Sequence, residues 1–173
     1  ETGVKTLPEL KKVNVLKKQK GGVFEGDLHP EVKAHVFSVT KRWLDPNGDG
    51  DSSDGVDGFR LDVASHVPLG FWRDYRKFVR GINPEALLLG EAWWINWPDD
   101  LMNPRPFLKG DIFDSVMHYQ WYKPARRLFA KANGGLKPTS FVAEMARVYE
   151  GYSKSLSQSL MNLVASHDSP RFG

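Results

Sequence analysis

The sequence predicts an α/β fold built on a parallel sheet. Helical and strand-like patterns alternate along the chain, and the strand-like segments are apolar enough to be buried on both faces. The connections between them are long enough for crossovers. This alternation is typical of a parallel sheet with right-handed crossovers, and both a closed barrel and an open doubly wound sheet are compatible with it.

The first half of the chain predicts two helices around one strand. Residues 29–44 (HPEVKAHVFSVTKRWL) predict a helix, with Pro30 suited to its first turn and apolar residues near helical spacing. Residues 56–64 (VDGFRLDVA) predict a strand. Residues 68–82 (PLGFWRDYRKFVRGI) predict a second helix with a largely aromatic stripe.

The second half predicts three more strands and two more helices. Strands are expected at residues 85–94 (EALLLGEAWW), 111–119 (DIFDSVMHY) and 161–168 (MNLVASHD). Helices are expected at residues 123–133, where Asn-Gly-Gly follows, and at residues 139–160.

Composition narrows the class of protein. The 173 residues are 40% hydrophobic and 12% aromatic, which is enough for one domain with a substantial core. The net charge is only +3, and the basic run at residues 11–20 is typical of a solvated face, so neither nucleic acid nor a membrane is expected as a partner. The absence of cysteine excludes disulfides and thiolate metal sites.

Two parts are expected along the chain. Residues 1–29 are polar and irregular and predict the end of a loop-rich subdomain, and residues 30–173 carry the alternating pattern. The sequence lacks an initiator Met and stops just past the last predicted strand. We therefore expect it to be a piece of a longer protein.

Polar side chains stand at the carboxyl ends of the predicted strands. In parallel α/β folds this edge is where sites are built. Each feature alone would fit a buried ion pair or a cap, and His118 is interpreted as structural or supporting. Three carboxylates gathered at one edge repel each other unless one is protonated or a cation helps, which is typical of an acid paired with a nucleophile or base. The set is Arg60, Asp62, Glu91, His118, His167 and Asp168.

Three of these segments resemble motifs of a known family. The segments DGFRLDVA, GEAW and ASHDSPRF resemble successive motifs of the α-amylase superfamily, glycoside hydrolase family 13, in that family's order. The resemblance covers roughly residues 30–173 and implies a TIM (β/α)8 barrel, of which this chain holds about strands 4 to 7. Residues 1–29 would then end the family's inserted subdomain, where residues 7–10 (LPEL) are weakly similar to a short motif. The family's third-strand motif is not found.

The resemblance assigns a role to each matched residue. Asp62 would be the nucleophile, and Glu91 the general acid and then the base. Asp168 would bind sugar hydroxyls, Arg60 would hold Asp62 ionised and oriented, and His167 would hydrogen-bond the sugar. Together they imply a retaining hydrolase acting by double displacement on α-1,4-glucans of the starch, maltodextrin, cyclodextrin or pullulan type. The segments GEAWW and SHDSPRF favour the neopullulanase and cyclomaltodextrinase group.

The physical requirements of this chemistry can be stated in advance. The apolar neighbours of Glu91, Ala92 and the tryptophans after it, should raise its pKa so that it holds a proton. Adjacent strands lie about 4.8 Å apart, so carboxylates at their ends can approach the roughly 5–5.5 Å of a retaining pair. The interpretation requires Asp62 and Glu91 to share one edge of the sheet and to remain within reach of solvent.

The aromatic residues after Glu91 are candidate sugar-binding groups. Trp93, Trp94 and Trp97 could stack on glucose rings, with simple loop packing as the alternative. Tyr119 and Tyr122 are weaker candidates for the same role.

The loop before the first strand matches part of a calcium-binding loop. Asp45, Asn47, Asp49 and Asp51 occupy alternate positions of an EF-hand pattern, but Val56 stands where the bidentate Glu belongs. A structural calcium ion is the favoured interpretation, and no cofactor is expected for the chemistry. A turn that only stops a helix is the alternative.

Three other functions remain open at this point. A glucanotransferase would carry the same three motifs. An inactive family member could serve as a carbohydrate-binding module, and a metal-dependent hydrolase of unrelated type could use the Asp and His residues. Because half of the barrel is missing, the chain alone is expected to have little or no activity.

Overall fold

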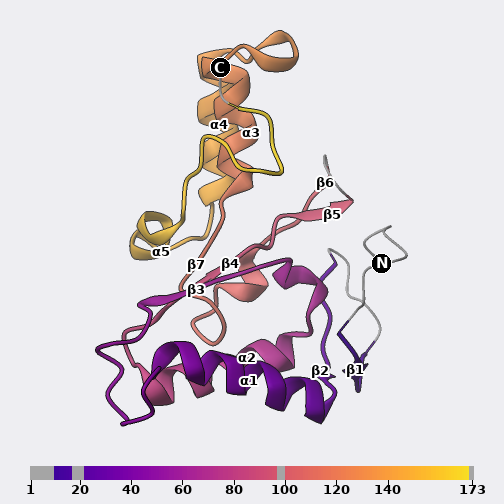
Figure 1. Ribbon diagram of the computed structural model, residues 1–173. Coiled ribbons are helices and arrows are strands. Elements are labelled where there is room, and N and C mark those ends of the chain that lie inside the picture. Colours follow the sequence, from indigo (N-terminus) through magenta and orange to yellow (C-terminus); the bar gives the residue numbers. More distant parts are fainter. Residues whose placement is uncertain (1–9, 17–21, 97–99, 172–173) are drawn as a thin grey trace.

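The computed structural model describes residues 10–16, 22–96 and 100–171. Its centre is a parallel sheet of β3 (Gly58–Leu61), β4 (Leu87–Gly90) and β7 (Ser115–Val116), in the order β3-β4-β7. Arg60 pairs with Leu89, and Gly90 with Val116. The predicted α/β class with a parallel sheet is confirmed, and the sheet is open rather than closed into a barrel (Figure 1).

Two helices cover one face of this sheet. Helices α1 (Pro30–Leu44) and α2 (Leu69–Ile82) lie side by side beneath it in Figure 1 and match the predicted ranges to within a residue. Pro30 and Pro68 suit the start of each helix because their fixed φ is compatible with a first turn or a cap. A bond from the Thr40 hydroxyl to the Tyr75 hydroxyl, 3.1 Å long, joins the two helices in the interior.

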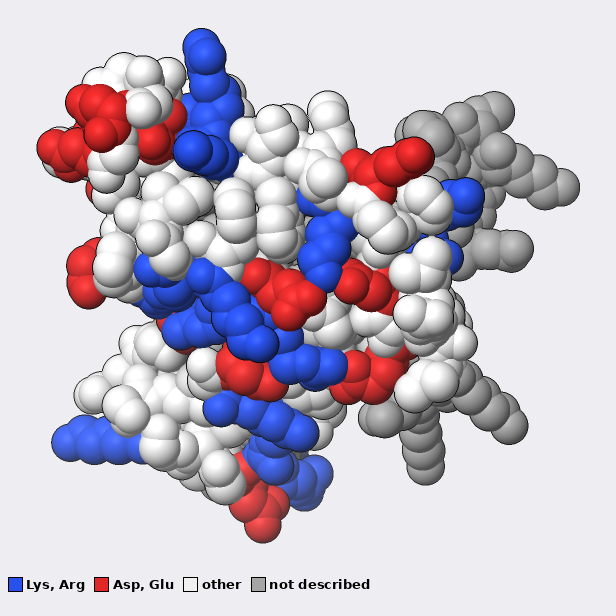
Figure 2. All heavy atoms as spheres, turned by 90° about the horizontal axis from the view of Figure 1, so that it is seen from below, with Lys and Arg blue, Asp and Glu red and all other residues white. Residues whose placement is uncertain are grey.

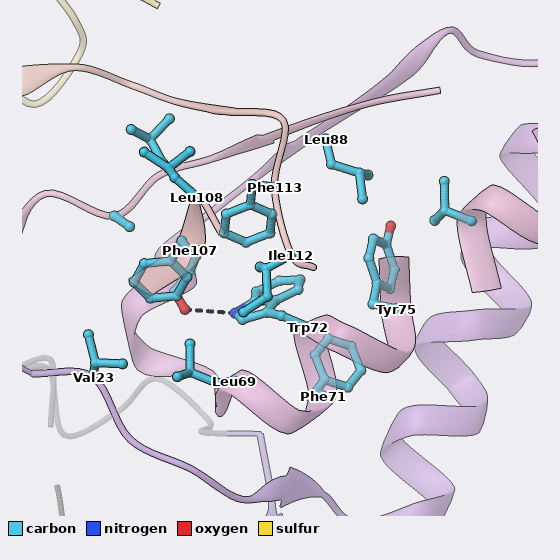
Figure 3. Close-up of a cluster of buried hydrophobic side chains, with 14 of the residues drawn as sticks. Val23, Leu69, Phe71, Trp72, Tyr75, Leu88, Phe107, Leu108, Ile112 and Phe113 are labelled. Atoms are coloured by element: carbon cyan, nitrogen blue, oxygen red, sulfur yellow. Dashed lines mark hydrogen bonds between the residues drawn. The ribbon is translucent and has the colours of Figure 1, made fainter. Parts of the chain in front are cut away.

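Aromatic side chains fill the space between α2 and the sheet (Figure 3). Trp72 packs edge-on against Phe113 at 5.1 Å, and Phe113 stacks on Phe107 at 5.6 Å. The Trp72 indole donates a 2.9 Å bond to the Ala64 carbonyl, so its buried N–H is satisfied. A β-carbon at Gly90 would collide with the Phe113 ring, which explains glycine at the end of β4.

Short ribbons and further helices complete the described chain. Two antiparallel ribbons pair β1 (Lys12–Val13) with β2 (Asp27–Leu28) and β5 (Trp94–Asn96) with β6 (Asp100–Leu101). On the other side of the sheet stand α3 (Tyr119–Phe129), α4 (Pro138–Tyr149) and α5 (Lys154–Ser159) (Figure 1). Short 3-10 turns occupy Ala64–His66, Arg105–Phe107 and Ala132–Gly134. None of the helices in the described part is both long and apolar enough to cross a membrane.

Two of the predicted elements in the C-terminal half are wrong in extent. The helix expected at 139–160 is divided, because Gly151 adopts a φ of +74° and Ser153 caps a new helix through a 3.1 Å bond from the Leu156 N–H. The helix expected at 123–133 begins four residues earlier, at Tyr119, and ends at Phe129.

The strand expected at 161–168 is reduced to one parallel bridge, between Met161 and Met117. The neighbouring strand β7 is only two residues long, and α3 begins at Tyr119. The described residues after Met161 therefore find no further extended residues next to β7 with which to pair. The other three strands are found where predicted but are shorter than predicted.

A carboxylate on the loop before β7 joins α2 to the sheet. Asp114 accepts bonds of 2.9 Å from the Arg76 guanidinium, the Arg80 guanidinium and the Leu88 N–H. Burial acts to raise the pKa of Asp114, but the Arg76 and Leu88 hydrogen bonds and the two arginine charges outweigh it and lower the pKa. Figure 2, seen from the side of α1 and α2, shows basic and acidic side chains interleaved over this face.

We predict that Asp114→Asn lowers the free energy of unfolding at pH 7 by about 2 kcal/mol, because the amide can still accept from Leu88 but loses the charge that pairs with two arginines. The pKa of Asp114 is lowered on folding, so its contribution is complete above the unfolded value of about 3.9 and is lost as pH falls below it. The difference between the two proteins should therefore shrink below about pH 4.

Urea unfolding at pH 7 and pH 3 measures this difference. The exposed Asp57→Asn removes an equal charge near the start of β3 and should change stability by less than about 0.5 kcal/mol. Equal effects of the two substitutions would contradict the role given to Asp114.

Candidate active site

One arginine holds two carboxylates at the carboxyl edge of the sheet. Arg60 lies in β3, Asp62 follows that strand, and Glu91 follows β4. The Arg60 guanidinium pairs with the Asp62 carboxylate through one Nη, and its Nη2 lies 2.9 Å from Glu91 Oε1. The Glu91 N–H donates to the Leu61 carbonyl at 2.9 Å and so extends the pairing of the two strands. The prediction that both acids share one edge is confirmed.

The two carboxylates differ sharply in exposure. The Asp62 side chain is 70% exposed, whereas that of Glu91 is 1% exposed. Glu91 Oε2 accepts the Val63 N–H at 2.9 Å, and Oε1 also accepts the Trp93 indole N–H at 3.4 Å. The expectation that Glu91 remains within reach of solvent is wrong for the described structure, because the turn after β3 and the Trp93 side chain enclose it.

Burial gives Glu91 a higher pKa than an ordinary glutamate has. Desolvation raises its pKa, and the nearby Asp62 charge acts in the same direction. The Val63 N–H, the Arg60 charge and the Trp93 bond lower it but do not outweigh burial, so the pKa is raised. The predicted direction is confirmed with burial as its main cause, whereas the neighbouring Trp93 acts in the opposite direction through its indole N–H.

The third predicted acid stands on a tight turn. Ser166 and Ser169 form an isolated antiparallel bridge, and the Asp168 N–H donates to the Ser166 hydroxyl at 3.1 Å. His167 Nε2 lies 3.2 Å from Asp168 Oδ2; the His167 side chain is 70% exposed and that of Asp168 36%. In the described chain neither residue hydrogen-bonds or ion-pairs with Asp62 or Glu91.

A stacked aromatic pair lies between Glu91 and this turn. The Trp93 and Tyr119 rings are stacked with centroids 4.0 Å apart, and the Tyr119 hydroxyl donates to Ser166 at 2.7 Å. Burial is the main cause of the raised pKa of Tyr119, and the charges of Glu91 and Asp168 both add to it. Asp168 therefore lies on the same side of the molecule as Glu91, with the aromatic pair between them.

A pocket of about 290 Å³ opens beside this aromatic pair. Trp93 contributes to its wall although it is almost fully buried, whereas Trp94 is half-buried and packs edge-on against Trp93 at 4.8 Å. Trp97 lies outside the described residues. The lining residues include Trp93, Tyr119, Tyr122, Asp168, Ser169 and Pro170, together with the basic Lys123, Arg126 and Arg127.

The side chains of the Asp-rich loop are engaged in hydrogen bonds within the loop itself. Asp45, Asn47 and Asp49 each accept an N–H from two or three residues further along the loop, at 2.9, 2.9 and 2.8 Å, and Asp51 does the same for Ser53. That bond to Ser53 is the main cause of the lowered pKa of Asp51. Within the described ranges, no group of three or more His, Cys, Asp or Glu side chains lies close enough together to hold a metal ion. The calcium ion remains a prediction from the sequence.

His118 has the buried position that a structural role requires. Its ring is 1% exposed, and Nδ1 lies 2.8 Å from the Asn162 amide oxygen. The main-chain N–H of His118 donates to the Met161 carbonyl at 2.9 Å. His118 therefore joins the end of β7 to the segment that leads to Asp168. Burial lowers the pKa of His118, although the Asn162 bond opposes this.

Sequence reasoning missed two features of the site. The Val63 backbone, which supplies a hydrogen bond to Glu91, gives no signal because a β-branched residue does not suggest a left-handed turn. The bond between Tyr119 and Ser166 joins residues 47 positions apart, and only the fold brings them together.

A parallel α/β sheet that gathers polar side chains at its carboxyl edge defines the class as that of an α/β domain with a candidate active site at the strand ends. The sequence model described as "Alpha amylase, catalytic domain" matches residues 27–173, and the chain belongs to this family.

Over the residues that align, curated relatives within the family are identical to this chain at about a third of positions. Neopullulanase 2 of Thermoactinomyces vulgaris is 38% identical over 144 residues, which are 83% of this chain and 22% of the relative. Cyclomaltodextrinase of Geobacillus thermopakistaniensis is 36% identical over 143 residues, or 83% and 21%. The debranching enzyme of Nostoc punctiforme superposes with a TM-score of 0.65 at 26% identity, covering 82% of this chain and 29% of that structure. The chain thus spans about a fifth of the length of its curated relatives.

We predict that His118 makes the fold sensitive to mild acid. Because its pKa is lowered on folding, its contribution to stability is complete above the unfolded value of about 6.5 and is lost as pH falls below it. The free energy of unfolding should fall between pH 7 and pH 5, and His118→Gln should flatten this fall while costing about 1 kcal/mol at pH 7. Urea unfolding at both pH values measures the slope.

The exposed His35 provides the control for this experiment. His35→Gln should leave the fall between pH 7 and pH 5 unchanged. If His118→Gln has the same pH dependence as the unmodified chain, His118 is not the group responsible.

Proposed function

We propose that this chain is the central part of the catalytic domain of a retaining α-glycoside hydrolase that acts on α-1,4-glucans. The observation that carries the proposal is the Arg60 guanidinium shared by Asp62 and Glu91 at the ends of adjacent parallel strands. Relatives named neopullulanase, cyclomaltodextrinase and amylopullulanase support the substrate class. In this proposal β3, β4, β7 and the segment from Met161 are strands 4 to 7 of a (β/α)8 barrel, which residues 1–29 precede as the end of an inserted subdomain.

The proposed reaction is a double displacement. Asp62, exposed and paired with Arg60, attacks the anomeric carbon, and the bond to the leaving oxygen breaks as Glu91 gives that oxygen its proton. In the second step Glu91 takes a proton from water while the water oxygen replaces Asp62 on the sugar. The raised pKa of Glu91 suits the first step because the group must arrive protonated.

The remaining predicted residues would bind the sugar. Asp168 would accept bonds from sugar hydroxyls, and His167 beside it would hydrogen-bond the same ring. Trp93 borders the pocket next to Asp168, and Trp94 packs against it, so the pocket would receive a glucose unit on an aromatic wall.

The burial of Glu91 favours a second candidate for the chain by itself. A general acid must be within hydrogen-bond reach of the leaving oxygen, and here both Glu91 oxygens are enclosed and already bonded. A chain in this form would bind glucan without cleaving it. Transfer to a sugar acceptor instead of water is the other alternative, since it needs the same first step.

We predict that this chain alone releases no reducing sugar from soluble starch or maltoheptaose above the level without protein, because its acid is enclosed. The test compares it with a chimera in which residues 27–173 replace the corresponding segment of neopullulanase 2. The chimera should cleave both substrates, and chromatography of the maltoheptaose products separates hydrolysis from transfer by the absence or presence of longer chains. Turnover by the chain alone equal to that of the chimera would contradict the prediction.

We further predict that Asp62→Asn lowers kcat of the chimera by at least about 10³-fold, because the amide cannot act as the nucleophile. The matched control is Asp57→Asn, which makes the same chemical change at an exposed residue beside the opposite end of β3. It should leave kcat within about twofold. Initial rates on maltoheptaose measure both variants. Full activity of Asp62→Asn would refute its assignment as the nucleophile.

A further inference from the structure

The residue between Asp62 and Ala64 has a strained backbone. Val63 adopts a φ of 45° and a ψ of 42°, in the left-handed region. Within the described ranges three other non-glycine residues have positive φ, two asparagines and a lysine, so Val63 is the β-branched member of the group. A β-branched side chain in this region is a genuine outlier, and such strain persists only where the surrounding structure enforces it.

Hydrogen bonds on both sides enforce this conformation. The Val63 N–H donates to Glu91 Oε2 and the Ala64 N–H to the Glu91 carbonyl, each at 2.9 Å. Ala64 is fully buried, and its carbonyl accepts the Trp72 indole N–H at 2.9 Å. Two successive N–H groups therefore point at a single residue, one at its side chain and one at its backbone.

The turn has opposite effects on the two acids. It turns the chain directly after Asp62, which is the residue that follows β3 and whose side chain is 70% exposed. It also brings a main-chain donor into the enclosed space around Glu91, where Arg60 holds the other carboxylate oxygen at 2.9 Å. A hydrogen bond from a main-chain N–H favours the charged form of a carboxylate, which opposes the effect of burial.

We propose that Val63 is a positioning residue, whose left-handed backbone fixes its N–H on Glu91 Oε2 and so holds the proposed acid in one orientation opposite Arg60. The proposal rests on the proposed function for the role of Glu91, but the bond itself is a property of this chain. A side-chain substitution cannot delete a main-chain donor, so the test must replace the amide.

The experiment replaces Val63 with the α-hydroxy acid analogue of valine by nonsense suppression, which turns the N–H into an ester oxygen and keeps the side chain. The Glu91 carboxyl is titrated by carbon-13 NMR in the whole chain, with its signal assigned by its loss in Glu91→Gln. Removing the donor should move the Glu91 titration midpoint to higher pH. An unchanged midpoint in a folded ester variant overturns the proposal.

The matched control is the same ester at Val56, whose N–H donates to the Trp43 carbonyl at 3.0 Å and makes no bond to Glu91. It removes a main-chain bond of similar length and should leave the Glu91 titration unchanged. A shift of equal size at Val56 would mean that general loosening, not the Val63 donor, moves the titration, and would also overturn the proposal.

A second pair of variants applies if the Val63 ester does not fold. Glycine adopts the left-handed region without strain, so Val63→Gly should raise the melting temperature and leave the Glu91 titration unchanged. The matched control site is Val67, which is half-buried and has an extended φ of −113°. Val67→Gly should lower the melting temperature, because glycine relieves no strain there. A lower melting temperature for Val63→Gly overturns the proposal. Neither readout involves turnover, so failure here is distinguishable from failure of the proposed hydrolase.

Discussion

The arrangement of the candidate site depends on one guanidinium. Two carboxylates that end adjacent strands about 4.8 Å apart would repel each other in a partly buried edge. Arg60 offers nitrogens in a planar fork, and one nitrogen pairs with Asp62 while another pairs with Glu91. A lysine carries a single ammonium group and could not present two fixed donors in two directions. Removing this cation would take away a charge that lowers the pKa of Glu91 and would leave burial and the Asp62 charge to raise that pKa further.

Shared pairing does not make the two acids equivalent, because their surroundings differ. Asp62 keeps most of its contact with water, whereas Glu91 lies behind Trp93 and the turn at Val63. Burial therefore acts mainly on Glu91 and raises its pKa. The division into one exposed and one enclosed carboxylate arises from the backbone at the end of β3, since the chain turns there directly after Asp62.

The features that were predicted correctly from the sequence are those that local residue patterns determine. Helices α1 and α2 carry apolar residues at helical spacing and have a proline at the first position or at the N-cap, and they lie where expected. The shared edge of Asp62 and Glu91 followed from parallel pairing alone. The break at Gly151 and the loss of the strand after Met161 depend on capping and on the length of the neighbouring strand, which are not visible in hydrophobic pattern. The enclosure of Glu91 depends on the strained turn at Val63, and valine is not a residue type that predicts a left-handed turn.

The third acid is held by a different kind of interaction from the other two. Asp62 and Glu91 are fixed by strand pairing, which continues to the last residue of β3 and β4. Asp168 follows a segment with a single bridge to the sheet, and side-chain contacts fix that segment instead: Leu163 is buried with Trp93 and Tyr119, and Tyr119 bonds Ser166. The Trp93–Tyr119 stack thus lies beside the turn that carries Asp168, which the Tyr122 hydroxyl also holds through the Pro170 carbonyl. Trp93 is therefore shared by both parts of the site, because it covers Glu91 and packs in the cluster that contains Leu163 of the segment before Asp168.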